Sequence, residues 1–428
     1  INASGSAIAI DEVDSLTLTA KGSIGSDAKP ITVNAKNITV TSNSVTAGDA
    51  NIFITNTPNV LNIDDSVGGD TVTLATIDTG IEGKITYRQA GQKLDITGPM
   101  KSHGGNILID PPTDLSINAL IDGDGGDVTA EANGNITFGA NGYIVTKGTG
   151  NILVQADIDS SGAGNLAFTN AGITTGSGET LKTFERVRTT GADGTGTGTG
   201  TIDLRGEKVI MENYSAKTLG HLSILAGVST INSSFGPDNV AGGGDDISAS
   251  AGQAYSSATA DSIYDLSAAS MNIETKGGLP LIGVVSDSQG IGQSGGSTLE
   301  ILSSGQVDAK TDGNVHLTSV ATNALSVGLI DVGANDVTLV GNANVTDTAA
   351  DAATDIIATT LTINNGAAGS AGDITLDTAV TTLKLNGGAV TIHDGDGVDI
   401  SSITATSLDL LTDGAITDSG AVAVNDLA

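Results

Sequence analysis

The chain has 428 residues, of which 59 are glycine and only 7 are proline, and it contains neither cysteine nor tryptophan. Its formal net charge of −32 excludes nucleic acid and anionic membrane surfaces as partners, because like charges repel. Without cysteine there are no disulfides, cysteine-ligated zinc sites or thiol nucleophiles, and no apolar run approaches the roughly 20 residues of a membrane-inserted helix.

Short segments of alternating apolar and polar residues begin near the N-terminus and recur along the chain, bounded by Gly, Asn, Asp and Ser. Their β-branched residues and two-residue period predict half-buried strands of three to five residues. The clearest examples are 16–18, 31–33, 38–40, 52–54, 107–109, 202–204, 299–301, 361–363, 374–376, 383–385 and 390–392. The best helix candidate, 351–363, fits a turn followed by a strand equally well.

A five-residue motif, Gly-[Asn/Asp]-aliphatic-x-apolar, accompanies many of these segments. It is found at 105–109, 126–130, 134–138, 150–154, 164–168, 313–317 and 372–376. Loose spacing with a constant strand pattern predicts a β-solenoid whose coils vary in length and stack their inward aliphatic side chains. Tandem immunoglobulin-like sandwiches are the alternative, but they need longer strands and a buried aromatic residue in each domain, and this chain has only 5 Tyr and 5 Phe.

We therefore predict one continuous, elongated all-β domain with irregular loop insertions in its middle third. The solenoid covers 1–177 and 263–428 and continues with insertions through 178–262. Two stretches interrupt the pattern: the basic segment 178–217, which includes the sequence GTGTGTG, and the Gly-, Ser- and Ala-rich segment 233–262. These are either simple insertions on one face or loops that carry a recognition surface.

Both ends of the chain have the sequence of ordinary coils and show no capping helix. The coils would therefore continue into further chain or into neighbouring subunits. The first residue is Ile1 rather than Met, so we expect a processed product or an excerpt of a longer chain.

Three stretches carry a family resemblance: GNITFGANGYIVTKGTGNILVQADID, AGDITLDTAVTTLKLNGGAVTIHD and LDLLTDGAITDSGAVAVNDLA. They resemble the β-helix repeats of filamentous haemagglutinin-type exoproteins and giant bacterial β-strand-repeat surface proteins. The resemblance implies a right-handed parallel β-helix, export to the bacterial cell surface or the medium, and a role in adhesion, matrix or fibre formation. The partners we expect are further copies of the chain, joined end to end or laterally, and glycans or proteins on host or neighbouring cell surfaces.

Two Gly-Asp turns are the best metal candidates. The first, IDGDGGDV, supplies Asp122, Asp124 and Asp127, and the second, HDGDGVDI, supplies Asp394, Asp396 and Asp399. Alternating carboxylates on a Gly-rich turn resemble the spacing of oxygen-ligated Ca²⁺ sites. True calcium rolls repeat such a motif in tandem, whereas here it occurs singly, so solvated turns are the alternative to bound calcium.

Catalytic signatures are missing from the sequence. It has no nucleophile elbow, phosphate loop or dinucleotide fingerprint, and the four histidines, which we expect at the surface or at corners, share no metal-ligand spacing (His103, His221, His316 and His393). We predict a non-enzymatic, secreted or cell-surface solenoid that contributes to a fibre, filament or matrix, in part by end-to-end stacking. The alternatives are a carbohydrate-active β-helix enzyme, which would need clustered carboxylates with a basic partner, and a Ca²⁺-dependent binding module.

Overall fold

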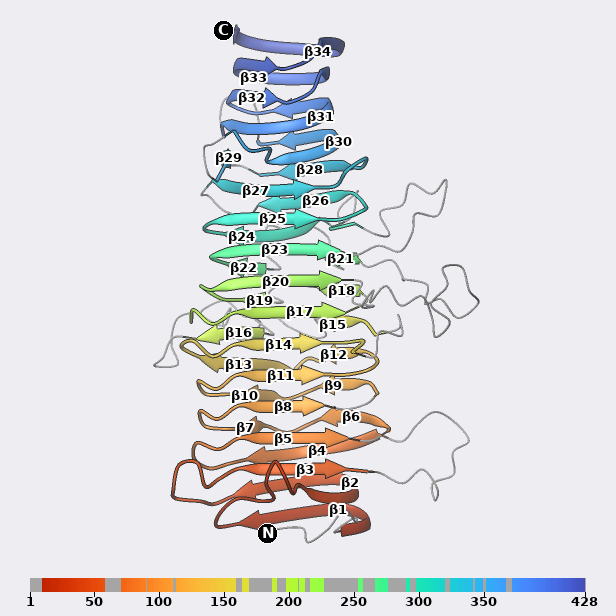
Figure 1. The fold of residues 1–428 in the computed structure, drawn as a ribbon, viewed down its shortest axis with the longest axis vertical. Helices are drawn as coiled ribbons and strands as arrows, with labels where there is room; N and C mark the ends of the chain where they lie inside the picture. The colour runs from red at the N-terminus through yellow and green to blue at the C-terminus, as the bar shows by residue number, and fades with distance from the viewer. Residues whose placement is uncertain are drawn as a thin grey trace, which may run out of the picture. The chain divides into compact units, whose positions relative to one another are not determined.

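The chain forms strands and turns, and the described residues contain no helix (Figure 1). A computed structural model describes residues 10–57, 71–89, 91–110, 113–158, 164–168, 187–190, 198–206, 208–211, 216–226, 253–256, 266–275, 290–292, 298–319, 324–341, 343–348, 352–366 and 372–427. No helix in these ranges is long and apolar enough to cross a membrane.

The chain divides into two compact units. The first unit comprises Ile1–Lys208, Ser215–Gly220 and Val228–Thr230, and the second comprises Val209–Tyr214, His221–Gly227 and Ile231–Ala428. The predicted boundaries at 177 and 262 are not tested by this division and stay predictions.

The first unit contains eighteen strands in its described residues. They are β1 (Ile10–Ala20), β2 (Ile31–Ser42), β3 (Ile52–Asn56), β4 (Thr71–Asp78), β5 (Ile85–Gln89), β6 (Lys93–Ile96), β7 (Met100–Lys101), β8 (Ile107–Asp110), β9 (Leu115–Ile117), β10 (Leu120–Asp122), β11 (Val128–Glu131), β12 (Ile136–Phe138), β13 (Tyr143–Lys147), β14 (Ile152–Gln155), β15 (Leu166–Phe168), β16 (Val187–Thr190), β17 (Ile202–Gly206) and β19 (Ala216–Lys217). Strand β18 (Lys208–Met211) includes residues assigned to both units.

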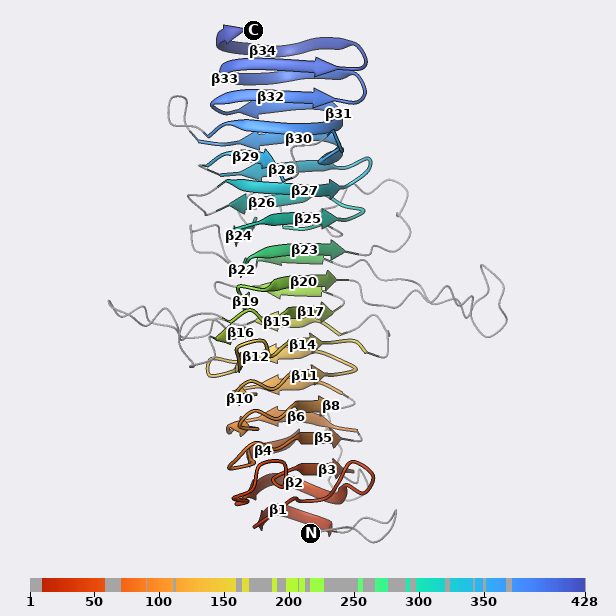
Figure 2. The ribbon, with the colours of Figure 1, turned by 60° about the vertical axis from the view of Figure 1, so that its left-hand side comes forward.

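Strands of the first unit form three parallel ladders, each joining a strand to the one three places further along. One ladder runs β5–β8–β11–β14–β17, a second runs β6–β9–β12–β15, and a third runs β7–β10–β13–β16–β19. Each turn of the chain thus adds one strand to each of three faces, and Figure 2 shows the strands of this unit one above another. This repeating all-β arrangement is consistent with a β-solenoid.

The strands of the second unit also pair in parallel, but most of them pair with the strand two places further along rather than three. They are β20 (His221–Ala226), β21 (Gln253–Ser256), β22 (Leu266–Ala268), β23 (Ser270–Thr275), β24 (Leu299–Ser303), β25 (Gln306–Lys310), β26 (Val315–Ser319), β27 (Leu325–Asp331), β28 (Asp336–Val340), β29 (Val345–Asp347), β30 (Ile356–Asn364), β31 (Ile374–Asn386), β32 (Ala389–Asp394), β33 (Val398–Thr412) and β34 (Ile416–Leu427). The longest, β33, has 15 residues, because here the extended backbone continues from one ladder into the next instead of stopping at each corner.

The core consists of rows of aliphatic side chains that stack from turn to turn. Ile107, Val128, Ile152 and Ile202 occupy one register position in four successive strands, and all four are buried. The row through β12 and β15 ends in two aromatic rings, Phe138 and Phe168, stacked with their centroids 4.7 Å apart. Burial of each such side chain stabilises the fold by about 1.5–3 kcal/mol. The two-residue period places these side chains on the inward face of each strand, and their burial drives the stacking of the turns.

The all-β prediction is confirmed in the described residues, where each of the eleven short segments lies within a strand. In the helix candidate 351–363, the described residues 352–355 precede strand β30, and 356–363 lie within it. Several strands in both units are longer than the predicted three to five residues, among them β1, β2, β31 and β33. Most of 233–262 and the first four residues of the sequence GTGTGTG, 194–197, lie outside the described residues. The proposal that these loops carry a recognition surface therefore stays a prediction.

Candidate functional site: corner ladders and an acidic corner

The glycine that opens the five-residue motif lies where successive turns of the chain approach each other closely. A Cβ on Gly105 would lie 2.4 Å from the carbonyl group of Gly83, and one on Gly126 would lie 2.1 Å from the carbonyl oxygen of Gly105. The same holds in the second unit, where a Cβ on Gly372 would lie 2.3 Å from the backbone of Ala343. Glycine is therefore required at this corner because any side chain would push the turns apart.

The second motif residue joins the same corners through its side-chain oxygen. The Oδ1 of Asn106 accepts a hydrogen bond from the Asp127 backbone N–H 21 residues later (3.0 Å), and the Asp127 Oδ1 accepts one from the Asn151 N–H (2.9 Å). Asn151 Oδ1 in turn accepts from the Thr201 N–H at 2.9 Å. Asn and Asp are the short side chains that present such an acceptor. We name this series the corner ladder.

Equivalent series occur elsewhere in both units. In the first unit, Asp114 Oδ1 accepts from the Asn135 N–H (2.8 Å) and Asn135 Oδ1 from the Asn165 N–H (2.9 Å). In the second, Asn344 Oδ1 accepts from the Asp373 N–H and Asp373 Oδ1 from the Ala389 N–H. The motif thus encodes the contact between neighbouring turns as well as the strand that follows it.

The first predicted calcium turn places its three carboxylates in separate contacts. Asp122 Oδ1 accepts from the Asp124 N–H at 2.9 Å, Asp124 forms an ion pair with Lys147, and Asp127 belongs to the corner ladder. Their ligand atoms do not all lie within 4.8 Å of one another. Calcium at this turn stays a prediction.

The three carboxylates of the second predicted calcium turn also make separate contacts. Asp394 is fully buried and its carboxylate accepts hydrogen bonds from the Thr378 hydroxyl (2.9 Å) and the Val380 N–H (3.0 Å). Asp399 accepts from the Thr417 hydroxyl at 3.0 Å, and Asp396 is exposed. These three carboxylates also do not converge, and calcium here too stays a prediction.

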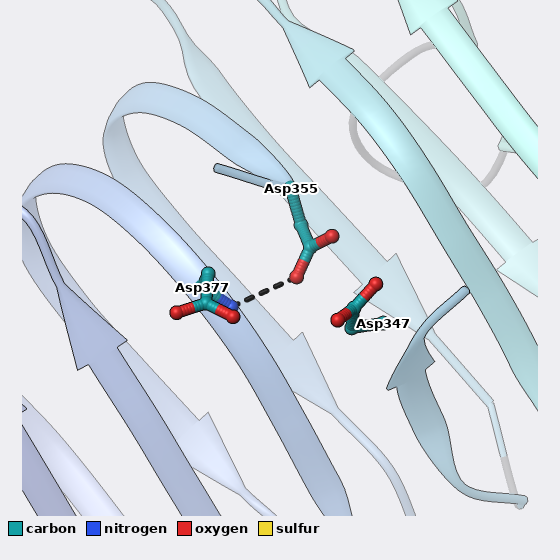
Figure 3. Close-up of side chains that lie close together, drawn as sticks. All are labelled: Asp347, Asp355 and Asp377. Carbon is teal, nitrogen blue, oxygen red and sulfur yellow. Dashed lines mark hydrogen bonds between the residues drawn. The ribbon is translucent and has the colours of Figure 1, made fainter. Parts of the chain in front are cut away.

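A different set of carboxylates does converge in the second unit. Asp347 at the end of β29, Asp355 just before β30 and Asp377 in β31 present oxygen atoms within 4.8 Å of one another (Figure 3). Among the described residues this is the one group of three or more acidic, histidine or cysteine side chains with that property. We name it the acidic corner. Proximity alone does not make these residues metal ligands, because a shared proton also allows carboxyl groups to approach.

Asp355 is the buried member of the acidic corner, with 3% of its surface exposed. Its Oδ2 accepts a hydrogen bond from the Asp377 backbone N–H at 2.8 Å (dashed in Figure 3), and the Asp377 Oδ1 lies 2.9 Å from Nδ1 of His393 in β32. The pKa of Asp355 is raised from 3.8 to about 7, and burial is the largest cause. The hydrogen bond from the Asp377 N–H acts against this rise, whereas the charges of Asp347 and Asp377 and a side-chain hydrogen bond with Asp347 contribute to it.

Sequence reasoning missed this corner because its residues share no local motif. The available signal was the length of one turn: Asp355 and Asp377 are 22 residues apart, close to the spacing of the corner-ladder residues.

The first unit also buries a polar group, but a neutral one. The Asn56 Oδ1 accepts from the Ala35 N–H (3.1 Å), and its Nδ2 donates to the Ala35 carbonyl (3.0 Å) and to the Tyr87 hydroxyl (3.3 Å). Tyr87 donates to Gln89 Oε1 at 2.8 Å, and the Gln89 amide donates to three backbone carbonyls. Burial raises the pKa of Tyr87 above its usual range, so the phenol stays neutral. We name this the polar core.

Charged residues of both signs follow one ladder of the first unit. Arg88 and Asp110 are adjacent in register with 3.8 Å between Nε and Oδ2, and Glu131 and Arg205 lie further along the same ladder. Burial and the Asp110 charge raise the pKa of Glu131, while Arg205 lowers it.

The histidines are dispersed, as expected from the sequence. His103 contacts Asp78 and His221 contacts Ser270, each at 2.9 Å. His316 differs from the prediction, because it is buried in β26 rather than at the surface or a corner.

Comparison with known proteins gives no relative: no family model, no curated protein and no solved structure matches the chain.

Proposed function

We propose that this protein is a non-enzymatic structural or adhesive β-solenoid, wound as a right-handed parallel β-helix and displayed on a bacterial surface or secreted. The observation that carries the proposal is the corner itself: one motif supplies the glycine for close approach, the acceptor for the next turn and the aliphatic residue for the core. Nearly all the recurring sequence features serve stacking, which favours stacking as the selected property.

Further copies of the chain are the first proposed partner. In the described part of the chain β34 pairs with β33 alone, and it exposes Ile416 (50%) and Val422 (43%), which stack on the buried Val398 and Ile403. A strand edge with an exposed apolar row is a template for another parallel strand. The proposed fibre or matrix grows by such end-to-end additions, and surface glycans or proteins of neighbouring cells are the proposed adhesive targets.

Electron microscopy and sedimentation over a concentration series test the assembly. Wild-type protein is expected to form filaments or elongated oligomers, and the double variant Ile416→Asp/Val422→Asp is expected to stay dispersed. Val45→Asp is the matched control, because Val45 is 91% exposed in a turn of the first unit and should leave assembly unchanged. A wild-type protein that stays monomeric at high concentration would overturn self-assembly, and a density map of the particles would determine the handedness.

A carbohydrate-active enzyme is the second candidate, favoured by one observation. In the ladder β5–β8–β11–β14–β17, Asp110 ends β8 in register with Arg88, and Glu131 ends the adjacent strand β11. Arg205 lies two strands beyond Glu131, with Gln155 between them. Carboxylates with basic neighbours are the groups that polysaccharide cleavage uses. Release of reducing or unsaturated sugar ends by wild-type protein, lost in Glu131→Gln, would support this candidate over the structural one.

A further inference from the structure

The acidic corner brings ionisable groups from four strands or their flanks into one short chain of contacts. His393 in β32 contacts Asp377 in β31, the backbone N–H of Asp377 donates to Asp355 before β30, and the oxygen atoms of Asp347 in β29 lie within 4.8 Å of the other two carboxylates. These contacts join successive turns of the second unit, so the charge of the corner acts directly on the stacking of those turns.

Positive charge on the surrounding elements is scarce. Strand β27, which pairs with β30, ends in Asp331, and Lys310 Nζ lies 3.7 Å from the carboxylate of that residue. Lys384 lies seven residues beyond Asp377 in β31. Strand β30 contains no ionisable residue. His393 contacts the corner through Asp377 rather than through the buried Asp355.

Three ionised carboxylates with one of them buried would repel strongly, since neighbouring like charges and removal from water both disfavour the charged form. Carboxyl groups at this separation are stabilised when one keeps its proton and donates it to another. Asp355 is the member that burial selects, and its carboxyl faces that of Asp347 (Figure 3).

We infer that Asp355 holds a proton at and below neutral pH and donates it to Asp347, making the acidic corner a proton-dependent clasp between turns of the second unit. Loss of that proton adds one negative charge to the cluster, and the added repulsion loosens β29, β30 and β31 from one another. This inference does not depend on the proposed function, because it concerns the stability of the second unit alone.

Infrared spectroscopy of the full chain tests the proton directly. Wild-type protein at pH 6 should show the absorption of a buried protonated carboxyl group, which disappears as the pH is raised through neutrality. The band should be missing in Asp355→Asn. Asp336→Asn, which changes an exposed carboxylate of β28, is the control and should keep the band.

Hydrogen exchange of the backbone amides of β29, β30 and β31 tests the clasp. Relative to Asp355→Asn at the same pH, local opening of the wild-type corner should increase by up to about tenfold per pH unit as the pH rises toward 7, the effect of one proton. Should Asp355→Asn not fold, Asp347→Asn serves instead, and removing that charge should move loss of the band to lower pH.

Three results would overturn the proposal. One is a wild-type spectrum at pH 6 without the protonated-carboxyl band. The second is a pH dependence of exchange that Asp355→Asn leaves unchanged. The third is protection of the corner by added Ca²⁺ at neutral pH in the wild type but not in Asp355→Asn, which would mean that a cation rather than a proton neutralises the cluster.

Discussion

The polar core of the first unit and the acidic corner of the second solve the same problem in opposite ways. Both place polar side chains out of water between stacked turns, but the polar core has donors and acceptors in balance, whereas the acidic corner has three acceptor groups and depends on an added proton. A neutral network is insensitive to pH, whereas a cluster of like charges changes with pH.

Breaking the polar core should produce the largest loss of stability. Asn56→Ala removes the partner of both backbone groups of Ala35 and of the Tyr87 hydroxyl and leaves a cavity. We expect a loss of about 3 kcal/mol in the free energy of unfolding of the first unit, equal at pH 5 and pH 8. Urea unfolding followed by hydrogen exchange in β3 and β5 measures it, with the exposed substitution Val45→Ala as control. A loss below about 1 kcal/mol would mean that water replaces the amide.

Replacing Asp355 of the acidic corner should change the free energy of unfolding less than Asn56→Ala does, and should raise it rather than lower it. The folded pKa of Asp355, about 7, lies above its unfolded value of 3.8, so the stabilising proton is fully present below pH 4 and its contribution is lost as the pH rises to 7. Asp355→Asn lacks this loss and should be more stable than wild type at pH 8, by roughly 2 kcal/mol after allowance for solvent screening, and about equal at pH 4. Urea unfolding of the second unit across this range measures the difference, and parallel pH curves for the two proteins would contradict the expectation.

Removing one hydroxyl from the polar core should change the free energy of unfolding by less than Asn56→Ala or Asp355→Asn does. Tyr87→Phe keeps the buried ring but leaves Gln89 Oε1 without the 2.8 Å hydrogen bond from the phenol. The expected loss is about 1 kcal/mol, again independent of pH. If the loss grows with pH, the phenol is ionising and the description of the polar core as neutral is wrong.

The sequence predicted the strands because they follow the two-residue period, and it predicted the repeat because Gly-[Asn/Asp] recurs at several of the corners. It could not predict which turns meet, since coil length varies: successive corner-ladder residues are 21, 24 and 50 residues apart at Asn106, Asp127, Asn151 and Thr201. Without that register, Asp347, Asp355 and Asp377 are three unrelated residues, while the Gly-Asp turns look like sites because their carboxylates are close in sequence. Their hydrogen bonds direct them to different neighbours.

The smallest expected effect comes from the corner ladder and separates it from a calcium site. Asp127→Asn keeps the Oδ1 acceptor for the Asn151 N–H and removes only the charge, so the free energy of unfolding should change by less than about 0.5 kcal/mol. Asn151→Ala, which deletes the acceptor for Thr201, should cost about 1 kcal/mol. Each variant should have the same melting temperature in EDTA as in Ca²⁺. Calcium held by Asp122, Asp124 and Asp127 would reverse the pattern, because the ion needs the carboxylate charge: Asp127→Asn would then lose the calcium-dependent part of its melting temperature, whereas Asn151→Ala would keep it.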